Sequence, residues 1–147
     1  MRKLLATSIL LCVALSLHAQ AITLDELKKY IVAMDSIEAL KVHLTETFNN
    51  LSKGNDKISS TRYHALVPVA NDDTKLKDAN ATPEEIAYVK KAAAIKDEET
   101  LKFQKAFQSL IQDYVGEAVF TKVRNGLKTD PSLKKKYDSL TAKPIRP

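Results

Sequence analysis

Apolar residues recur at helical spacing over the stretch that begins "ITLDELKKYIVAMDSIEAL". The stripe comprises Leu24, Leu27, Ile31, Met34, Ile37, Leu44, Phe48 and Leu51. Steps of three, four or seven residues place such a set along one side of a helix. Thr23 followed by Glu26 has the pattern of a capping box, and Gly54 is placed to end the helix. The pattern therefore predicts one helix of about 30 residues, which needs a partner of similar length.

A second long helix is predicted from residue 82 to about residue 114. Its stripe comprises Ile86, Val89, Ala93, Phe103, Phe107, Leu110 and Tyr114. Thr82 is placed as the cap, Pro83 takes the first helical position, and Glu85 completes a second capping box. The run "KDEET" at 96–100 interrupts the stripe. It indicates either a solvated stretch or a break in the helix.

Three shorter helical segments complete the predicted fold. The first covers about 59–70 and contains Pro68, which tends to bend or end a helix. The second covers about 116–127. The third starts at Asp130-Pro131, with Leu133, Tyr137 and Leu140 on one face, and 141–147 is expected to be a loose tail. The predicted fold class is all-α, a helical bundle of long and short helices.

The two halves of the chain resemble each other. "TRYHALVPVANDDTKL" at 61–76 aligns without a gap to 118–133, placing Asp73 on Asp130 and Leu76 on Leu133. Two interpretations stay open: a tandem duplication of a helical hairpin, with halves of about 22–79 and 80–140, or two hairpins that share only helical spacing. If the leucines are equivalent, both should be buried. The second copy should be the better formed, because Pro131 preorganises its helix start.

The N-terminal residues have the pattern of a secretory signal peptide. Arg2 and Lys3 precede an apolar run, and Ala19-Gln20-Ala21 is a small-x-small cleavage site. The run is shorter than the roughly 20 apolar residues of a membrane-spanning helix, which argues against an anchor. We expect residues 1–21 to be removed, leaving 22–147 as a single domain without a transmembrane segment.

Cleavage changes the composition that the fold can use. The only cysteine, Cys12, lies within the signal, so the mature chain has none and its chemistry excludes thiol catalysis and cysteine metal sites. Removing two basic residues and no acidic ones lowers the net charge from +5 to +3. The predicted location is outside the cytoplasm, in the periplasm or the extracellular space. An exported chain without disulfides depends on its apolar core for stability.

The C-terminal half also resembles a known family. "FTKVRNGLKTDPSLKKKYDSL", with an aromatic helix that leads into Asp130-Pro131 and Leu133, is similar to the closing motif of exported bacterial helical proteins catalogued as domain of unknown function 4168. Asp25-Glu26-Leu27 is similar to the acidic opening of that family. The resemblance covers about a fifth of the chain. It implies export and a helical fold, and it carries no functional residue.

Candidate catalytic and metal chemistry is sparse. The mature chain holds two histidines, His43 and His64, on different predicted helices and without the Glu-x-x-His spacing of helical metal sites. No glycine-rich phosphate loop, Gly-x-Ser-x-Gly elbow or His-Glu-x-x-His motif occurs. We therefore expect no metal, no cofactor and no enzymatic activity.

Basic side chains gather near the C-terminus. The candidate basic patch comprises Arg124, Lys128, Lys134, Lys135 and Lys136. Acidic neighbours dilute it, which favours a solvated helix face. The alternative is contact with a polyanion of the cell envelope, since aromatic residues suited to stacking on nucleic-acid bases are missing.

Three functions remain open on these grounds. The first is a binding or interaction module of the bacterial cell envelope, whose partner is an unknown protein or polymer and which an uncovered apolar patch would mark. The second is a carrier of a small apolar ligand between the long helices, lined by Met34, Phe103 and Phe107, which a cavity of roughly 300 Å³ or more would favour. The third is an enzyme without a recognisable motif.

Overall fold

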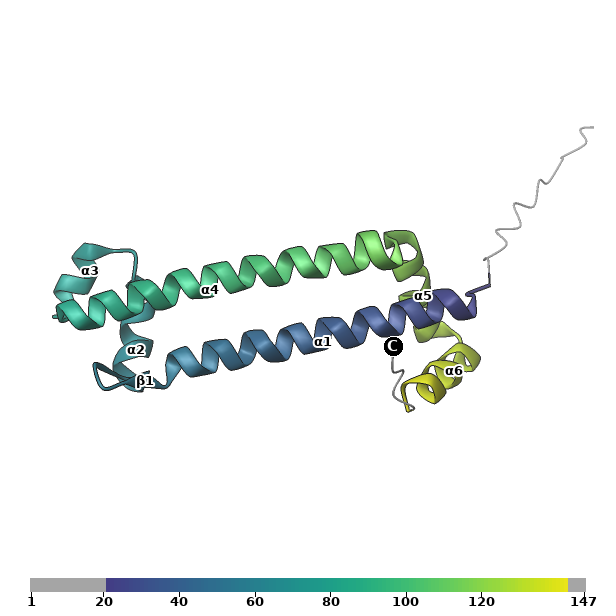
Figure 1. The fold of residues 1–147 in the computed structure, drawn as a ribbon, viewed down its shortest axis with the longest axis horizontal. Helices are drawn as coiled ribbons and strands as arrows, with labels where there is room; N and C mark the ends of the chain where they lie inside the picture. The colour runs from purple at the N-terminus through teal and green to yellow at the C-terminus, as the bar shows by residue number, and fades with distance from the viewer. Residues whose placement is uncertain (1–20, 143–147) are drawn as a thin grey trace, which may run out of the picture.

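The all-α fold class is confirmed by the computed structural model, which describes residues 21–142. Its elements are α1 (Leu24–Ser52), β1 (Gly54–Asn55), β2 (Ile58–Ser59), α2 (Ser60–Leu66), η1 (Val67–Val69), α3 (Asp73–Asp78), α4 (Pro83–Ser109), η2 (Leu110–Val115), α5 (Glu117–Thr129) and α6 (Pro131–Thr141). The two long helices α1 and α4 lie side by side as a hairpin (Figure 1). We call the end with α2 and α3 the distal end, and the end with α5 and α6 the proximal end.

Both long helices begin at the predicted capping boxes. The Thr23 amide donates to the Glu26 carboxylate at 2.7 Å, and the Glu26 amide donates back to the Thr23 hydroxyl at 3.1 Å. The same reciprocal pair joins Thr82 and Glu85 at the start of α4. These bonds satisfy backbone donors that lack partners within the helix. The starts of α1 and α4 are therefore determined by local sequence.

The far ends of the long helices differ from the expectation in detail. α1 ends at Ser52, and Gly54 adopts a φ of 75° where the chain turns into the two-stranded β1–β2 hairpin. α4 continues through 96–100 without a break, so this acidic run is a solvated stretch of one helix. The chain then forms the π-helical turn η2 and reverses at Gly116, whose φ is 88°.

Buried apolar residues form two cores at opposite ends of the hairpin. The distal core comprises Ile58, Tyr63, Leu66, Ala70, Leu76, Val89 and Ala92. The proximal core comprises Leu27, Tyr30, Ile31, Val123 and Leu133. In the part of the chain that the structure describes, α1 has no buried residue beyond Ile37 and α4 has none beyond Ala92. The middle of the hairpin is thus a pair of helices without a closed core.

The two copies of the aligned turn are alike in burial but differ in register. Leu76 is 0% exposed and Leu133 is 8% exposed, so each leucine enters a core, and the first copy is the more completely buried. Asp130 caps α6 as predicted, whereas the cap of α3 is Asp72 and not its neighbour Asp73. The burial order is the reverse of the one expected from the Asp-Pro start.

The shorter helical segments largely follow the prediction. Pro68 lies in the turn η1, where α2 has already ended, in agreement with its effect on helices. Helix α6 extends to Thr141, the first residue of the predicted loose tail, and residues 143–147 of that tail lie outside the described residues. The predicted signal peptide lies outside the described residues, apart from Ala21. Within residues 21–142, no helix combines the length and the apolar character that a membrane crossing needs.

Candidate functional site

A first apolar groove lies at the distal end, between the end of α1, the β1–β2 turn and the start of α4. Its volume is ≈ 610 Å³. Leu51, Tyr88, Ala92 and Ile95 contribute apolar surface, and the Tyr88 hydroxyl donates to the Leu51 carbonyl at 3.0 Å. The other lining residues are Asn55, Lys57, Pro83, Glu84, Ala87 and Lys91, all exposed. Because most of its walls face solvent, this distal groove is open and is not an enclosed cavity.

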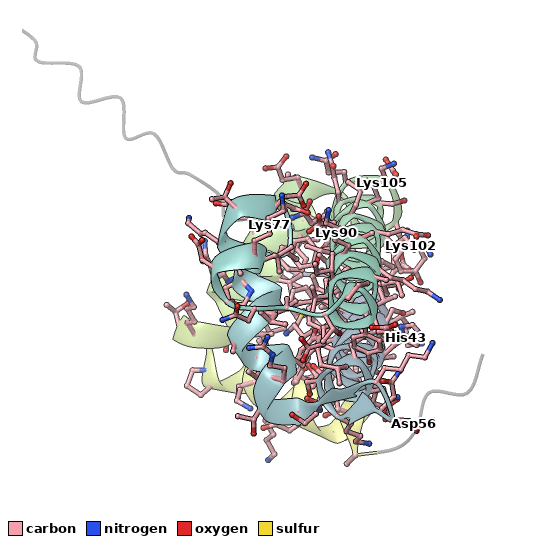
Figure 2. The ribbon with its side chains drawn as sticks, turned by 90° about the vertical axis from the view of Figure 1, so that its left-hand side faces the viewer. His43, Asp56, Lys77, Lys90, Lys102 and Lys105 are labelled. Carbon is pink, nitrogen blue, oxygen red and sulfur yellow. The ribbon has the colours of Figure 1, made fainter. Side chains whose placement is uncertain are left out.

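A second groove, which we call the central groove, follows along the same helix pair. Its volume is ≈ 450 Å³, and its lining comprises Leu40, His43, Leu44, Glu99, Lys102, Phe103 and Ala106. His43 and Lys102 project from the long helices on the side away from α2 and α3 (Figure 2). Lys102 follows Ile95 of the distal groove by seven residues, or about two helical turns, so it lies on nearly the same side of α4. The distal and central grooves therefore follow one another along one face of the hairpin.

Charged groups at the central groove pair with one another. Lys102 Nζ lies 2.8 Å from a carboxylate oxygen of Glu98 and 2.8 Å from one of Glu99. These two carboxylates raise the pKa of Lys102 above its ordinary value, and the Lys102 hydrogen bond lowers the pKa of Glu99. Both shifts favour the charged forms of Lys102 and Glu99, which suits a polar rim better than proton transfer.

The three residues predicted to line one ligand pocket occupy different places. Met34 packs against the proximal core. The rings of Phe103 and Phe107 stack with centroids 6.1 Å apart, one turn from each other on α4. Phe103 lines the central groove, while Phe107 is 38% exposed and is not among the residues that line either groove. Of the predicted set, only Phe103 contributes to the candidate site.

The candidate basic patch lies on α5 and α6. Arg124, Lys128, Lys134, Lys135 and Lys136 are all exposed. Lys134 Nζ is 2.6 Å from the Asp138 carboxylate and 5.8 Å from the centroid of the Tyr137 ring, so part of this charge is neutralised locally. The patch belongs to the proximal end and is separate from the residues that line the grooves.

The two histidines have separate surroundings. His43 lines the central groove on α1, and His64 lies on α2 with its ring edge-on to Tyr63 at 5.4 Å between centroids. Across residues 21–142, no group of three or more His, Cys, Asp or Glu side chains is arranged to hold a metal ion.

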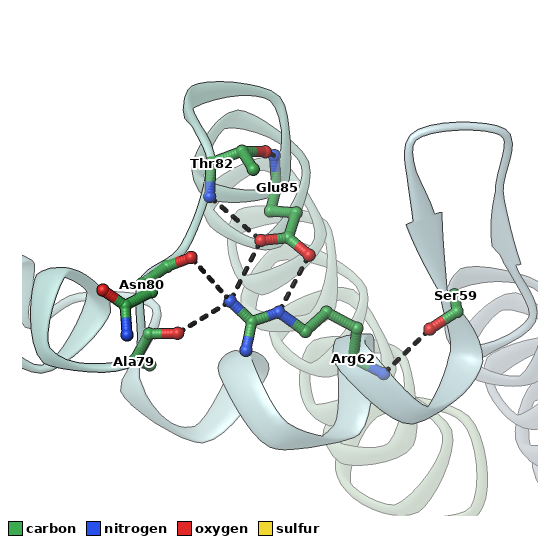
Figure 3. A network of polar contacts seen from close by, with 6 residues as sticks. All are labelled: Ser59, Arg62, Ala79, Asn80, Thr82 and Glu85. Atoms are coloured by element: carbon green, nitrogen blue, oxygen red, sulfur yellow. Dashed lines mark hydrogen bonds and ion pairs between the residues drawn. The ribbon is translucent and has the colours of Figure 1, made fainter.

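A network around Arg62 holds the distal end together (Figure 3). The Arg62 guanidinium donates from Nε to Glu85 at 2.8 Å and from Nη2 to the same carboxylate at 3.1 Å. It also donates to the backbone carbonyls of Ala79 at 2.8 Å and Asn80 at 3.0 Å. One side chain of α2 therefore binds both the loop after α3 and the capping carboxylate of α4, next to the distal groove.

The Arg62 network should make stability depend on acid pH. The hydrogen bond from Arg62, with that from the Thr82 amide, lowers the pKa of Glu85 below its ordinary value of 4.5. A depressed folded-state pKa contributes stability above the unfolded-state value, and this contribution is lost as the pH falls through the folded-state value. We expect Glu85→Gln to lower the denaturant midpoint at pH 7, and the difference from the wild type to shrink as the pH is lowered from 7 to about 3.

The matched control for this prediction is Glu46→Gln. Glu46 lies in the C-terminal half of α1, is exposed, and takes part in none of the ion pairs found within residues 21–142. Its removal should change the midpoint little at either pH. A constant difference between Glu85→Gln and the wild type from pH 7 to about pH 3 would contradict the assigned role of the Glu85 charge.

Several groove residues were not singled out from the sequence. Leu40, Tyr88, Ile95 and Ala106 flank the stripes that predicted the long helices and are not the centre of either stripe. The available signal was their spacing: Tyr88, Ile95 and Lys102 are each seven residues apart.

Comparison with protein-family models, curated proteins and solved structures finds no match to this chain.

Proposed function

We propose that this chain is an exported, non-enzymatic helical protein of the bacterial cell envelope that acts as a binding or interaction module. The observation that carries the proposal is the pair of apolar grooves in line on the α1–α4 face, the central one over a section of the hairpin without buried side chains. A helix gains most of its stability from burying one face, and a large apolar surface left open is typical of interaction sites.

The shape of the grooves favours an elongated partner. Their lining residues on α4 extend from Pro83 to Ala106, which corresponds to about 35 Å of helix at 1.5 Å per residue. An amphipathic helix can lie along such a surface with anchors every three or four residues. The charged residues at the edge, such as Lys57, Glu84 and Lys91, would remain solvated around a central apolar contact.

Carriage of a small apolar ligand is the second candidate function. Both groove volumes, ≈ 610 and ≈ 450 Å³, exceed the roughly 300 Å³ at which ligand sites begin. Against it, ligand sites usually bury most of the ligand surface, whereas exposed residues form most of the distal groove. The open shape therefore ranks the interaction module above the carrier.

Export and the envelope location rest on the signal-peptide pattern of residues 1–21. The resemblance to exported helical proteins through Asp130-Pro131 and Leu133 supports the same location. The non-enzymatic assignment is supported by the shifted titratable groups. Among residues 21–142, each resolved pKa shift is explained by an ion pair, a helix cap or the burial of a tyrosine. The partner is expected to be a protein or polymer of the envelope.

A charge placed in the distal groove tests the proposed function. Ala87 is an exposed lining residue within a helix, so Ala87→Glu should fold normally and put a carboxylate on the apolar contact. We expect mass spectrometry of material copurified from the native envelope to identify a partner, and Ala87→Glu to weaken the binding of that purified partner at least about tenfold.

The matched control is Ala118→Glu, an exposed alanine of α5 at the other end of the molecule. It should bind as the wild type does. Copurification of an apolar small molecule that Ala87→Glu releases would replace the interaction module with the carrier. Equal binding by the wild type and both variants would contradict the assignment of the distal groove as the site.

A further inference from the structure

Charged residues on the outer side of α4 alternate in sign at a strict interval. Glu84, Lys91, Glu98 and Lys105 are each separated by seven residues, and all four are exposed. Seven residues make about two helical turns, so the four lie along one side of the helix with a drift of about 20° per step. Figure 2 shows Lys105 and Lys102 on the outer side of α4.

A row of exposed apolar residues accompanies these charges. Ala87, Ala94 and Leu101 follow the first three charged residues by three positions each and are exposed, Leu101 to 50%. Residues three positions apart are neighbours on a helix surface. The alanines would let a second helix approach closely, because their side chains are small. This apolar row and the four charges define the outer α4 stripe, which also forms one wall of the distal groove through Glu84, Ala87 and Lys91.

The charge order of the outer α4 stripe is complementary to its own reverse. When a second α4 runs antiparallel, with the centre of the pairing between Ala94 and Ile95, each Glu84 faces a Lys105 and each Lys91 faces a Glu98. The apolar row has its own centre at Ala94, where Ala87 of one copy lies opposite Leu101 of the other, and this centre is half a residue from that of the charges. A parallel alignment in register would place like charges opposite each other. Charge and apolar pattern thus favour the same arrangement.

We propose that two copies of this chain associate through the outer α4 stripe, with their α4 helices antiparallel. The proposal rests on the proposed interaction function, since it names a second copy as one partner of the face that carries the grooves. The contact is isologous, because each stripe contributes the same residues to both sides of a twofold axis. Glu98 already binds Lys102 of its own helix at 2.8 Å, and in the pair it also faces Lys91 of the other copy.

Exposed ion pairs contribute little affinity each, but like charges brought face to face disfavour a pairing. Charge exchange therefore tests the proposal directly. In the acidic variant Lys91→Glu/Lys105→Glu the stripe is entirely negative, and in the basic variant Glu84→Lys/Glu98→Lys it is entirely positive. We expect sedimentation velocity to show a concentration-dependent dimer for the wild type, dimerisation at least about tenfold weaker for each variant alone, and a one-to-one heterodimer when the two variants are mixed.

The variant Lys128→Glu/Lys135→Glu is the control. It makes the same change in net charge as the acidic variant at exposed positions of α5 and α6, and it should dimerise as the wild type does. Circular dichroism establishes that each variant is folded. Failure of the mixture to form the heterodimer, or a wild type that stays monomeric up to about 200 µM, would overturn the proposal. If the protein is monomeric but still binds an envelope partner, the pairing is contradicted and the proposed function stands. If it forms the homodimer but binds no envelope partner, the proposed function is contradicted and the pairing stands.

Discussion

Replacing Leu76 with alanine is expected to lower the free energy of unfolding by about 2 to 5 kcal/mol. Leu76 is 0% exposed and belongs to the distal core, where α3 packs back on the long helices. The substitution removes apolar contacts and leaves a cavity that its neighbours fill only in part. A loss of this size is a large share of the total stability of a small domain, so denaturant melts followed by circular dichroism measure it directly.

Leu133→Ala provides the comparison. Leu133 is 8% exposed and belongs to the proximal core, where α6 contacts α1 and α5. We therefore expect a loss of unfolding free energy at the lower end of the same range, about 2 kcal/mol. The exposed Leu101→Ala is the control and should change stability by less than about 0.5 kcal/mol at concentrations where the protein is monomeric. A neutral Leu76→Ala would mean that α3 is not docked on the distal core.

Replacing Gly54 with alanine is the second change with a large expected effect. Gly54 has a φ of 75°, a conformation that side chains disfavour, and a Cβ built there lies 2.2 Å from the Ile58 carbonyl oxygen. Strain of this kind costs on the order of 1 to 3 kcal/mol. The contact is with backbone and not with a movable side chain, so we expect the β1–β2 turn to open and the stability to fall by about 2 kcal/mol or more.

Gly116→Ala separates the two causes of this loss. Gly116 has a φ of 88°, but a Cβ at this position meets no atom within 4 Å. It should therefore show only the conformational cost, about 1 kcal/mol, and the Gly54 variant should be clearly the less stable of the two in denaturant melts. Equal losses would show that the contact with the Ile58 carbonyl is relieved without disturbing the turn.

The sequence allowed the long helices to be predicted because their signals are local. Thr23 and Thr82 each have a glutamate three positions later, and the apolar stripes that follow determine which side of each helix is buried. The same reasoning gave Asp130 as a helix cap. The alignment of Asp73 with Asp130 implies a cap at Asp73, but Asp72 caps α3, because the two adjacent aspartates can each serve as a cap.

The residues that line the grooves could not be predicted from the sequence, because they depend on how α1 and α4, which are distant in sequence, pack against each other. Phe103 and Phe107 both belong to the apolar stripe of α4, yet only Phe103 lines a groove, because Leu40 and Leu44 of α1 lie across from it. Met34 was grouped with them by residue type. It packs against the proximal core, to which α5 and α6 contribute Val123 and Leu133. Pairing register, and not residue type, decides which side chains share a site.

Because the two cores are separate, the loop-closure entropy lost on folding differs between the distal and the proximal end. The residues of the distal core and those packed on it span 51–93, so they meet by closing short loops. The proximal core joins 22–34 to 119–140 and closes a loop of at least about 85 residues. Loop-closure entropy grows with the logarithm of loop length, so a threefold longer loop costs about 1 kcal/mol more. The distal end is thus the part that local contacts can organise first, and the docking of α5 and α6 on α1 completes the fold.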